Sequence, residues 1–331
     1  MVRIAINGFG RIGRQFFKAA WERRNEGIEI VAINDLMPLE SLAYLLRHDS
    51  VYGSWGHEIR VDGNSLVVDN QYIPMYSERD PSMLPWRDLG VEVVVEATGV
   101  FTKKEKASKH IDAGARKVLI TAPSDDADFT IIKGANEHLY DKSRHVIISN
   151  GSCTTNAVTP TLKVLDDNFG VEYAFISTIH AYTATQSTVD RADPKHLERG
   201  RAAAVNIVPT TTGASRAVVK ALPHLTGRIT AIAYRVPVVN GSVVEINATL
   251  KRNTTKNYVN WLYGEVSKYH LKGILGYSDE PLVSTDIIGN PLSGIVSGLH
   301  TEVKDNKVRV VVWYDNEWGY SNRLVDVVKL L

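Results

Sequence analysis

A single cysteine lies in a segment whose residue types suit nucleophilic chemistry. Cys153 is the only cysteine of the 331-residue chain, so no disulfide can form within it. A lone cysteine is most often a small buried apolar residue. Here the segment Ser149–Asn156 (SNGSCTTN) links an apolar run to a helical pattern, which places Cys153 in the first turn of a helix. Because the positive end of a helix dipole stabilises a thiolate, we interpret Cys153 as a reactive thiol.

A glycine-rich turn near the start of the chain suits phosphate binding. Gly8, Gly10 and Gly13 form a G-x-G-x-x-G motif that follows the predicted strand Val2–Asn7 and opens a helical pattern, the context in which the motif binds dinucleotides. The first glycine would allow the tight turn, the second the approach of a pyrophosphate, and the third close packing of helix on strand. The free N–H groups of the helix N-terminus would then face the phosphates.

Asp35 ends the second predicted strand, 22 positions after Gly13. Dinucleotide-binding units carry an acidic residue about 20 residues beyond the glycines, where it bonds the ribose. A carboxylate there accepts from the 2′-hydroxyl of NAD and repels the 2′-phosphate of NADP. The sequence therefore favours NAD, and strand, helix and acid together argue against a glycine-rich turn without a ligand.

The first half of the chain alternates apolar strands with helical patterns. Continuous apolar strands separated by helices predict a parallel sheet covered on both faces, a Rossmann-type α/β domain. The expected strands are Val2–Asn7, Ile28–Asn34, Glu92–Thr98, Lys117–Thr121 and His145–Ser149, and the expected helices are Arg11–Arg24 and Lys103–Ala113.

The second half is richer in alternating strands. A helix is predicted over Cys153–Asn168. Ser152 would cap it, Gly170 would end it, and Pro160 is expected to kink it. The alternating strands that follow predict a mostly antiparallel sheet with one wetter face, in an α+β catalytic domain. The expected strands are Tyr173–His180, Thr230–Val236, Ser242–Lys251 and Val308–Tyr314, followed by an amphipathic helix over Asn322–Leu331. We predict a cofactor domain over 1–152, a catalytic domain over 153–315, and a C-terminal helix within 316–331 that packs back on the first domain.

Composition argues against several classes of function. The net charge is +1, with 44% hydrophobic and 23% charged residues, so no strong field attracts nucleic acid or a membrane surface. The apolar runs are too short to span a bilayer, and the first residues form a strand pattern rather than a basic leader. We therefore expect a cytoplasmic protein with no membrane, nucleic-acid or metal partner.

The chain resembles the phosphorylating glyceraldehyde-3-phosphate dehydrogenase family over its whole length, from INGFGRIGR at the start to DNEWGYSNR near the end. The motif SCTTN around Cys153 is followed in order by HAYTATQ, GRAAA, VPTTTGA and YRVP. The resemblance implies NAD(P)-dependent oxidation of glyceraldehyde 3-phosphate, with inorganic phosphate as the second substrate. The reaction would pass through a thiohemiacetal and a thioester on Cys153, and the assembly would be a homotetramer.

The resemblance also assigns site residues. Cys153 matches the nucleophile and His180 the general base, although His180 alone would be interpreted as a sheet-edge histidine bonded to backbone. The implied cofactor positions are Asn7, Gly8, Phe9, Gly10, Arg11, Ile12, Gly13, Asp35, Arg79, Thr98, Gly99, Thr121, Asn316 (at the nicotinamide carboxamide) and Tyr320. The implied substrate and phosphate positions are Ser152, Thr154, Thr183, Arg199, Thr212, Gly213 and Arg235.

These phosphate positions divide into two anion sites, one with Thr183 and Arg235 and one with Thr154, Arg199, Thr212 and Gly213. Arginine offers a rigid fork to phosphate oxygens, and threonine hydroxyls add directional donors. Without the resemblance, Arg199 would be interpreted as a solvated surface charge.

Two departures from the family pattern bear on specificity. Strictly NAD-dependent members often have a proline where this chain has Ala192, and Arg191 beside it offers a partner for a 2′-phosphate, so NADP use is possible alongside NAD. Glu198 stands where many members have an arginine. Two alternatives stay open: erythrose-4-phosphate dehydrogenase, and a non-catalytic nucleotide- or RNA-binding role that the near-neutral charge does not favour.

Overall fold

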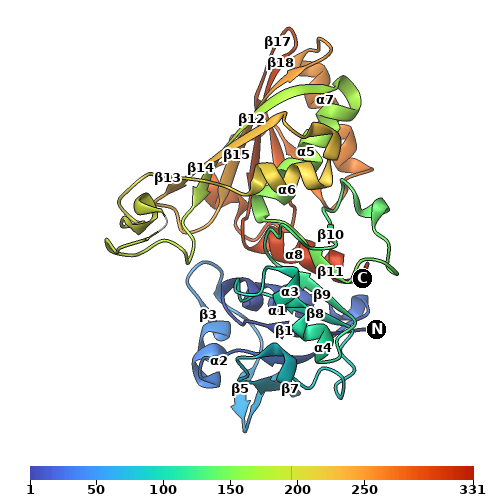
Figure 1. Ribbon diagram of the computed structural model, residues 1–331. Helices are drawn as coiled ribbons and strands as arrows, with labels where there is room; N and C mark the ends of the chain where they lie inside the picture. Colours follow the sequence, from blue (N-terminus) through green and yellow to red (C-terminus); the bar gives the residue numbers. More distant parts are fainter. Residues whose placement is uncertain (195) are drawn as a thin grey trace. The chain divides into compact units, whose positions relative to one another are not determined.

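The computed structural model describes residues 1–194 and 196–331, which form two compact units (Figure 1). The first unit comprises Met1–Ile131, His138–Gly151 and Leu324–Leu331, and the second comprises Ile132–Glu137 and Ser152–Arg323. Helix α8 (Trp318–Val328) begins in the second unit and ends in the first.

The first unit is built on a nine-stranded sheet in the order β10-β11-β9-β8-β1-β2-β7-β6-β5. Every pairing from β10 to β7 is parallel, which confirms the predicted parallel sheet, and β7, β6 and β5 add an antiparallel edge. The strands are β1 (Val2–Asn7), β2 (Ile28–Asn34), β5 (Ile59–Asp62), β6 (Ser65–Val68), β7 (Gln71–Tyr76), β8 (Val93–Glu96), β9 (Lys117–Ile120), β10 (Phe129–Thr130) and β11 (Ile147–Ser149), with a separate pair β3 (His48–Asp49) and β4 (Gly53–Ser54).

The helices of this unit are α1 (Arg11–Glu22), α2 (Leu39–Arg47), α3 (Lys104–Ala107) and α4 (Lys109–Asp112). The single helix predicted over Lys103–Ala113 is thus two short helices divided at Ser108, whose hydroxyl and backbone N–H both donate to the Lys104 carbonyl, at 2.8 and 2.9 Å. The C-terminal segment is tied in by ion pairs, Arg23 to Asp326 at 2.6 Å and Lys329 to Glu26 at 2.5 Å.

The second unit is built on a seven-stranded sheet in the order β13-β14-β12-β15-β18-β17-β16. Four pairings are antiparallel, while β12–β14 and β16–β17 are parallel, so the sheet is mostly antiparallel as predicted. The strands are β12 (Val171–Ala181), β13 (Val208–Thr210), β14 (Ile229–Val236), β15 (Ser242–Leu250), β16 (Leu275–Ser278), β17 (Gly294–Lys304) and β18 (Lys307–Tyr314).

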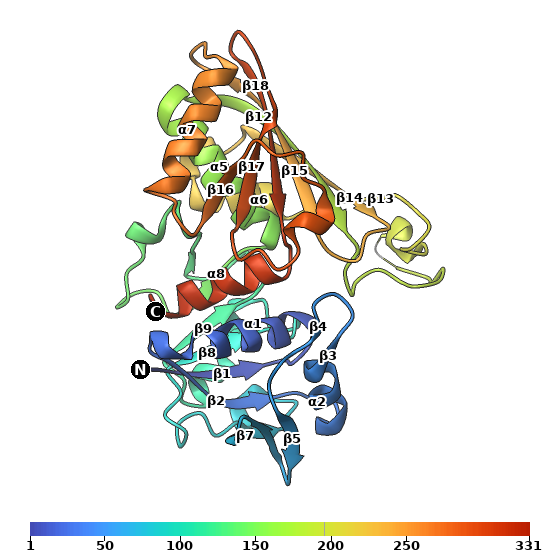
Figure 2. The same cartoon turned by 180° about the vertical axis from the view of Figure 1, so that it is seen from behind.

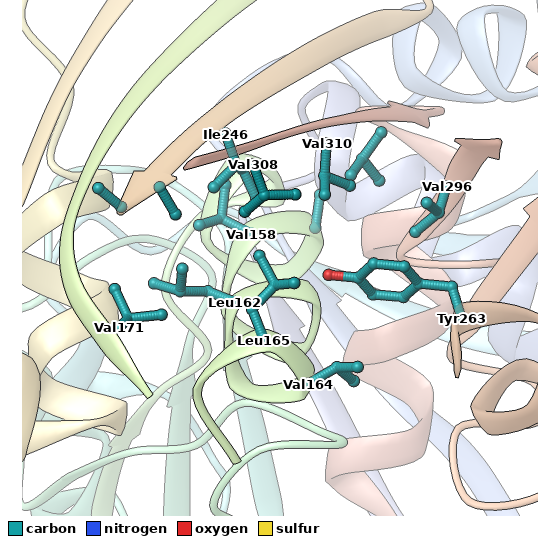
Figure 3. Close-up of a cluster of buried hydrophobic side chains, with 14 of the residues drawn as sticks. Val158, Leu162, Val164, Leu165, Val171, Ile246, Tyr263, Val296, Val308 and Val310 are labelled. Carbon is teal, nitrogen blue, oxygen red and sulfur yellow. The ribbon is translucent and has the colours of Figure 1, made fainter. Parts of the chain in front are cut away.

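Three helices cover one face of this sheet: α5 (Cys153–Phe169), α6 (Ala214–Ala221) and α7 (Lys256–Lys268) (Figures 1 and 2). Figure 3 shows the resulting core, where Val158, Leu162 and Leu165 of α5 meet Ile246 and valines of the sheet. The opposite face is more exposed, as predicted. It is not purely polar, however, because Phe175 and Ile232 are 58% and 37% exposed there.

Local signals decide where α5 and α8 begin. Ser152 caps α5 with a capping box shared with Thr155, and Gly170 ends the helix at φ +70°. The C-terminal helix starts at Trp318 rather than at the predicted Asn322, because the Asp315 carboxylate accepts from the Trp318 N–H at 2.8 Å and caps the earlier turn.

Candidate active site

Cys153 and His180 meet in the second unit. Cys153 is the first residue of α5, and His180 lies near the end of β12. Their Sγ and Nε2 atoms are 3.3 Å apart. The histidine is buried and the cysteine is half-buried. The structure therefore brings together the two residues that the motifs singled out, at a distance that permits proton transfer.

The other imidazole nitrogen has two partners with opposite requirements. Arg235 sits opposite His180 in the parallel β12–β14 pairing, with Nη1 2.5 Å from His180 Nδ1. The Ala181 carbonyl lies 2.7 Å from the same Nδ1. A guanidinium can only donate and a carbonyl can only accept. The imidazole can thus keep its proton on Nδ1 and offer a lone pair to the sulfur, or carry it on Nε2 and donate to the sulfur.

Burial and one positive charge set the electrostatics of this pair. Burial raises the pKa of the Cys153 thiol, while the Arg235 charge and hydrogen bonds from Thr154 lower it. Burial, then the Arg235 charge, lowers the pKa of His180 to about 3. The imidazole is therefore neutral near pH 7. We attributed the reactivity of Cys153 to the helix start, which favours the thiolate. Burial has the opposite effect, because it raises the pKa of the thiol.

Tyr314 is a part of this site that the sequence analysis missed. Its buried hydroxyl lies 2.9 Å from Thr154 Oγ1 and 2.8 Å from Thr178 Oγ1, and its ring meets the His180 ring edge to face at 5.8 Å. Tyr314 thus joins the residue after Cys153 to the strand that carries His180. Alternation along β18 predicts that its side chain points inward, but nothing in the sequence indicates the two threonine partners.

Asn316 is held by the loop that starts β15. Its Oδ1 accepts from the Ser242 hydroxyl at 2.8 Å and from the Gly241 N–H at 3.2 Å. The neighbouring Asp315 carboxylate accepts from Gly289 N at 2.8 Å. Tyr320, in the first turn of α8, is buried, and burial raises its pKa. Both predicted residues thus sit on one ordered segment of the second unit.

The predicted anion-site residues come from several elements. Arg235 lies in β14, Thr154 in α5 and Arg199 in a 3-10 helix over Leu197–Gly200, while Thr183, Thr212 and Gly213 lie in loops. Arg199 donates to the Thr211 carbonyl and to the Thr211 hydroxyl, each at 3.1 Å. The pKa of Arg235 is lowered mainly by burial, and the charge of Arg199 lowers it further. Thr212 accepts from Ala214 N at 3.1 Å and, with Gly213, leads into α6. Thr183 bonds Gln186 through its N–H at 2.7 Å. Two cations within electrostatic range of each other favour an anion between them.

A pocket of about 360 Å³ lies along the glycine turn of the first unit. Six predicted cofactor positions line it: Asn7, Gly8, Gly10, Asp35, Arg79 and Thr98. The prediction missed other lining residues, namely Asn34, Leu36, Glu78, Ala97, Val100 and Phe101. These residues end or follow β2, β7 and β8, whose carboxyl ends meet at one sheet edge. The topology rather than any motif therefore brings them together.

The three glycines of the turn have different surroundings. Gly8 has φ +93°, and a Cβ there would lie 2.7 Å from Thr98 N. A Cβ at Gly13 would collide with the Gly8 carbonyl oxygen, whereas a Cβ at Gly10 would have nothing within 4 Å. Gly8 and Gly13 are therefore required by packing. Gly10 leaves open space beside α1, whose N-terminus no side chain within the described ranges caps.

Asp35 and Asn7 are fixed by hydrogen bonds at the pocket wall. Asp35 Oδ2 accepts from Phe9 N at 2.6 Å and Oδ1 from Met37 N at 2.9 Å. Asn7 accepts from Asn34 Nδ2 at 2.7 Å. These contacts hold a carboxylate and amide groups beside the turn before any ligand binds, which is what a preformed ribose site requires.

A buried polar network lies beneath Thr98. The Glu96 carboxylate accepts from Thr98 N at 2.9 Å, Asn7 Nδ2 at 2.5 Å and His110 Nε2 at 3.1 Å. Trp86 Nε1 donates to His110 Nδ1 at 3.0 Å, which leaves the histidine proton on Nε2. The network ties the pocket wall to the fully buried Trp86.

The remaining predicted cofactor positions do not line this pocket in the described part of the chain. Phe9 is fully buried, Arg11 pairs with Asp49 at 2.6 Å, and Thr121 follows β9. Ile12 and Gly13 lie within α1, and Gly99 lies between lining residues.

Within residues 1–194 and 196–331, no group of three or more histidine, cysteine, aspartate or glutamate side chains is arranged to hold a metal ion. None of the helices in those ranges combines the length and the apolar character needed to cross a bilayer.

Comparison with known proteins agrees with this geometry. Models for the glyceraldehyde 3-phosphate dehydrogenase NAD binding domain and C-terminal domain match residues 2–104 and 152–316. The chain is 51% identical over 332 residues to the glyceraldehyde-3-phosphate dehydrogenase of Thermotoga maritima, and 50% identical over 333 residues to that of Kitasatospora aureofaciens, covering 100% of this chain and 99% of each relative. Identity to glyceraldehyde-3-phosphate dehydrogenase 2 of Bacillus subtilis is 47% over 329 residues, 99% of this chain and 96% of the relative. The similarity covers the full length of the chain, and the structure has both a paired cysteine and histidine and a glycine-turn pocket. The chain therefore belongs to the glyceraldehyde-3-phosphate dehydrogenase family.

Proposed function

We propose that this chain oxidises glyceraldehyde 3-phosphate with NAD and inorganic phosphate to 1,3-bisphosphoglycerate. The observation that carries the proposal is the 3.3 Å approach of Cys153 Sγ to His180 Nε2 in a chain with this family's sequence. Cys153 is the proposed nucleophile, and His180 the proposed acid and base.

The protein's own groups account for the proton movements. The Cys153 sulfur attacks the aldehyde carbon, and the thiol proton passes through His180 Nε2 to the former carbonyl oxygen, giving a thiohemiacetal. The Cys153 backbone N–H, which has no intrahelical acceptor at the first position of α5, donates to that oxygen as charge develops. His180 Nε2 then takes the hydroxyl proton back as hydride leaves the carbon, and a thioester remains on Cys153.

When bound, NAD accepts the hydride. Its adenosine and pyrophosphate are proposed to lie along Asp35 and Gly10 in the first unit, and its carboxamide against Asn316. The pocket fits this use, because it combines a fixed carboxylate, a glycine turn without a Cβ and a helix N-terminus.

Phosphate completes the cycle. A phosphate oxygen attacks the thioester carbon, the C–S bond breaks, and the Cys153 thiolate leaves as the acyl phosphate forms. We assign the substrate phosphate to Thr183 and Arg235, and the attacking phosphate to Thr154, Arg199, Thr212 and Gly213. Ser152 holds the helix start, since its hydroxyl accepts from Thr155 N at 3.1 Å.

We further propose NAD as the preferred cofactor with some use of NADP, a homotetramer, and a cytoplasmic location. The exposed Phe175 and Ile232 on the outer sheet face support self-association. The proposed cofactor domain is residues 1–152 with the helix in 316–331, and the proposed catalytic domain is 153–315.

A coupled absorbance assay tests the function. Reduction of NAD should require glyceraldehyde 3-phosphate and phosphate together, and should stop after alkylation of Cys153 or in Cys153→Ser. Erythrose 4-phosphate in the same assay separates the paralogous activity, which would win if its kcat/KM were the higher. Nucleotide binding with no turnover on either sugar would instead favour a non-catalytic role.

A further inference from the structure

A chain of hydrogen bonds runs to Asn316 from β12, the strand that carries His180. The Ala181 N–H donates to Ser242 Oγ at 3.1 Å, and the Ser242 hydroxyl lies 2.8 Å from Asn316 Oδ1. Ala181 directly follows His180, and its carbonyl is the one that contacts His180 Nδ1. Ser242 and Asn316 are 1% and 5% exposed, so water does not compete freely for these bonds.

The donors fix which end of the Asn316 amide faces the protein. The Gly241 backbone N–H can only donate, so the amide atom 3.2 Å away must be the oxygen. That oxygen can only accept, so the Ser242 hydroxyl proton must point to it. The serine lone pair then accepts from Ala181 N. The donor and the acceptor of each hydrogen bond in this series are thus fixed.

Turning the amide around would be costly. The NH₂ group would then face the Gly241 N–H, and two donors would meet in a buried place, leaving a backbone N–H unpaired. Gly241 itself is required here, because its φ is +87° and a Cβ would collide with the Ser284 carbonyl oxygen. The N–H that selects the amide orientation is therefore held rigidly.

We propose that Ser242 is a positioning residue for the nicotinamide ring. By holding Asn316 Oδ1, it makes Asn316 present its Nδ2 donors to the carbonyl oxygen of the carboxamide. No hydrogen bond among residues 1–194 and 196–331 uses Asn316 Nδ2. The inference rests on the proposed function, which assigns Asn316 to the carboxamide. It adds a coupling, since the Ala181 backbone contacts His180 through its carbonyl and Ser242 through its N–H.

The first test compares two nucleotides in Ser242→Ala. NAD⁺ carries the nicotinamide ring, and ADP-ribose lacks it. We expect the Kd for NAD⁺ to rise about threefold to tenfold, the range of one neutral hydrogen bond, while the Kd for ADP-ribose stays unchanged. Ser297→Ala is the matched control, because Ser297 is a buried serine of the same sheet whose hydroxyl bonds His300 at 2.8 Å. Equal weakening of both nucleotides, or of neither, overturns the proposal.

A coupling test follows from the same chain. In an Asn316→Ala background, Ser242→Ala should cause no further loss of NAD⁺ affinity, because the group that Ser242 positions is gone. A full additional loss would show that Ser242 acts elsewhere and would reject the proposal. Ser242→Thr, which keeps the hydroxyl, should restore most of the NAD⁺ affinity.

A measurement on the wild-type protein does not depend on how the variants fold. The 3-acetylpyridine analogue of NAD⁺ keeps the ring carbonyl and replaces the amide NH₂ by methyl. If Asn316 donates to the carbonyl, the analogue should bind within about threefold of NAD⁺. Binding more than about tenfold weaker would mean that Asn316 accepts from the NH₂, which contradicts the assigned orientation. Turnover of glyceraldehyde 3-phosphate with NAD⁺ in the same preparation tests the proposed function separately.

Discussion

Arg235 faces His180 across the parallel pairing of β12 and β14, with its Nη1 2.5 Å from the imidazole Nδ1. The guanidinium therefore acts on both members of the Cys153–His180 pair. It disfavours imidazolium, which helps to hold the pKa of His180 at about 3, and it favours a thiolate on Cys153. The Arg235 charge thus adds to burial, the main cause of the lowered His180 pKa, and opposes the effect of burial on the thiol pKa.

This relationship predicts a pH shift in thiol reactivity. Arg235→Leu should move the midpoint of Cys153 alkylation by iodoacetamide to higher pH, since the thiolate loses the positive charge that lowers its pKa. The experiment is best done in a His180→Gln background, because removing Arg235 also raises the pKa of His180. A neutral reagent avoids attraction to the guanidinium. A midpoint that stays fixed or falls would contradict this account of Arg235.

Tyr314→Phe removes one hydroxyl and with it one hydrogen bond to each of two threonines, of which Thr178 keeps its bond to the Val243 carbonyl at 3.2 Å. We expect the free energy of unfolding to fall by about 1–3 kcal/mol, the net contribution of two hydrogen bonds. We also expect kcat to fall, because Thr154 adjoins Cys153. Denaturant melts and steady-state kinetics measure the two effects. A matched control is Tyr269→Phe, which alters an exposed tyrosine and should change neither.

Gly10→Ala and Gly13→Ala should separate binding from folding. A methyl group at residue 10 meets no protein atom within 4 Å, so stability should hold while NAD affinity falls, because the methyl occupies the space beside the turn. At residue 13 the methyl collides with the Gly8 carbonyl, so the thermal midpoint itself should drop. Thermal melts and NAD titrations of both variants test the pair. Equal stability losses would refute the distinction.

Asp35 should control the choice between NAD and NADP. The wild type is expected to favour NAD in kcat/KM. Asp35→Asn removes the negative charge but keeps an oxygen for the Phe9 N–H, so the preference should shrink about tenfold or more through loss of repulsion. Assays with both cofactors measure the ratio. A wild type that prefers NADP tenfold would overturn our assignment of Asp35.

Asp49 should stabilise the first unit in a pH-dependent way. It accepts from Arg11 at 2.6 Å and from Gln15 at 2.7 Å, and its pKa lies below the usual value despite burial, through backbone donors and Arg11. A lowered folded-state pKa gives stability that is present above the unfolded pKa and is lost as pH falls through the folded value. Asp49→Asn should therefore cost about 2–4 kcal/mol at pH 7, and the cost should shrink below about pH 4.

Chemical denaturation across pH tests this expectation. Asp190→Asn is the control, because its pair with Arg201 is 61% exposed on both sides, and such pairs contribute about 0–1 kcal/mol. A constant difference between wild type and Asp49→Asn from pH 3 to pH 8 would show that the carboxylate charge is not what matters.

The features that could be predicted from the sequence depend on short segments of the chain. The cap at Ser152, the glycine turn and the acid at Asp35 each depend on neighbours within a few dozen residues, and these patterns have local physical causes. One local signal went unused: Asp62-Gly63-Asn64-Ser65 closes the β5–β6 hairpin, with Gly63 at φ +55°, as expected of a two-residue turn.

The rest depends on sheet register. His180 and Arg235 become neighbours only because β12 and β14 pair in parallel, and Tyr314 reaches Thr154 and Thr178 only because β18 lies two strands from β12. No periodicity encodes which strands pair. The family resemblance supplied the names His180 and Arg235, but it did not supply the contact between them, or the part played by Tyr314.

The hydrogen-bond path from Trp86 through His110 and Glu96 to Thr98 gives the protein a natural optical reporter. The chain has six tryptophans. Trp86 and Trp21 are buried, whereas Trp261 is 56% exposed, so the buried indoles emit at shorter wavelengths than the exposed one. We expect a nucleotide bound beside Thr98 to alter the electric field at Trp86 through this path, without any added label. The blue edge of the emission spectrum should therefore follow pocket occupancy, while the red edge stays constant.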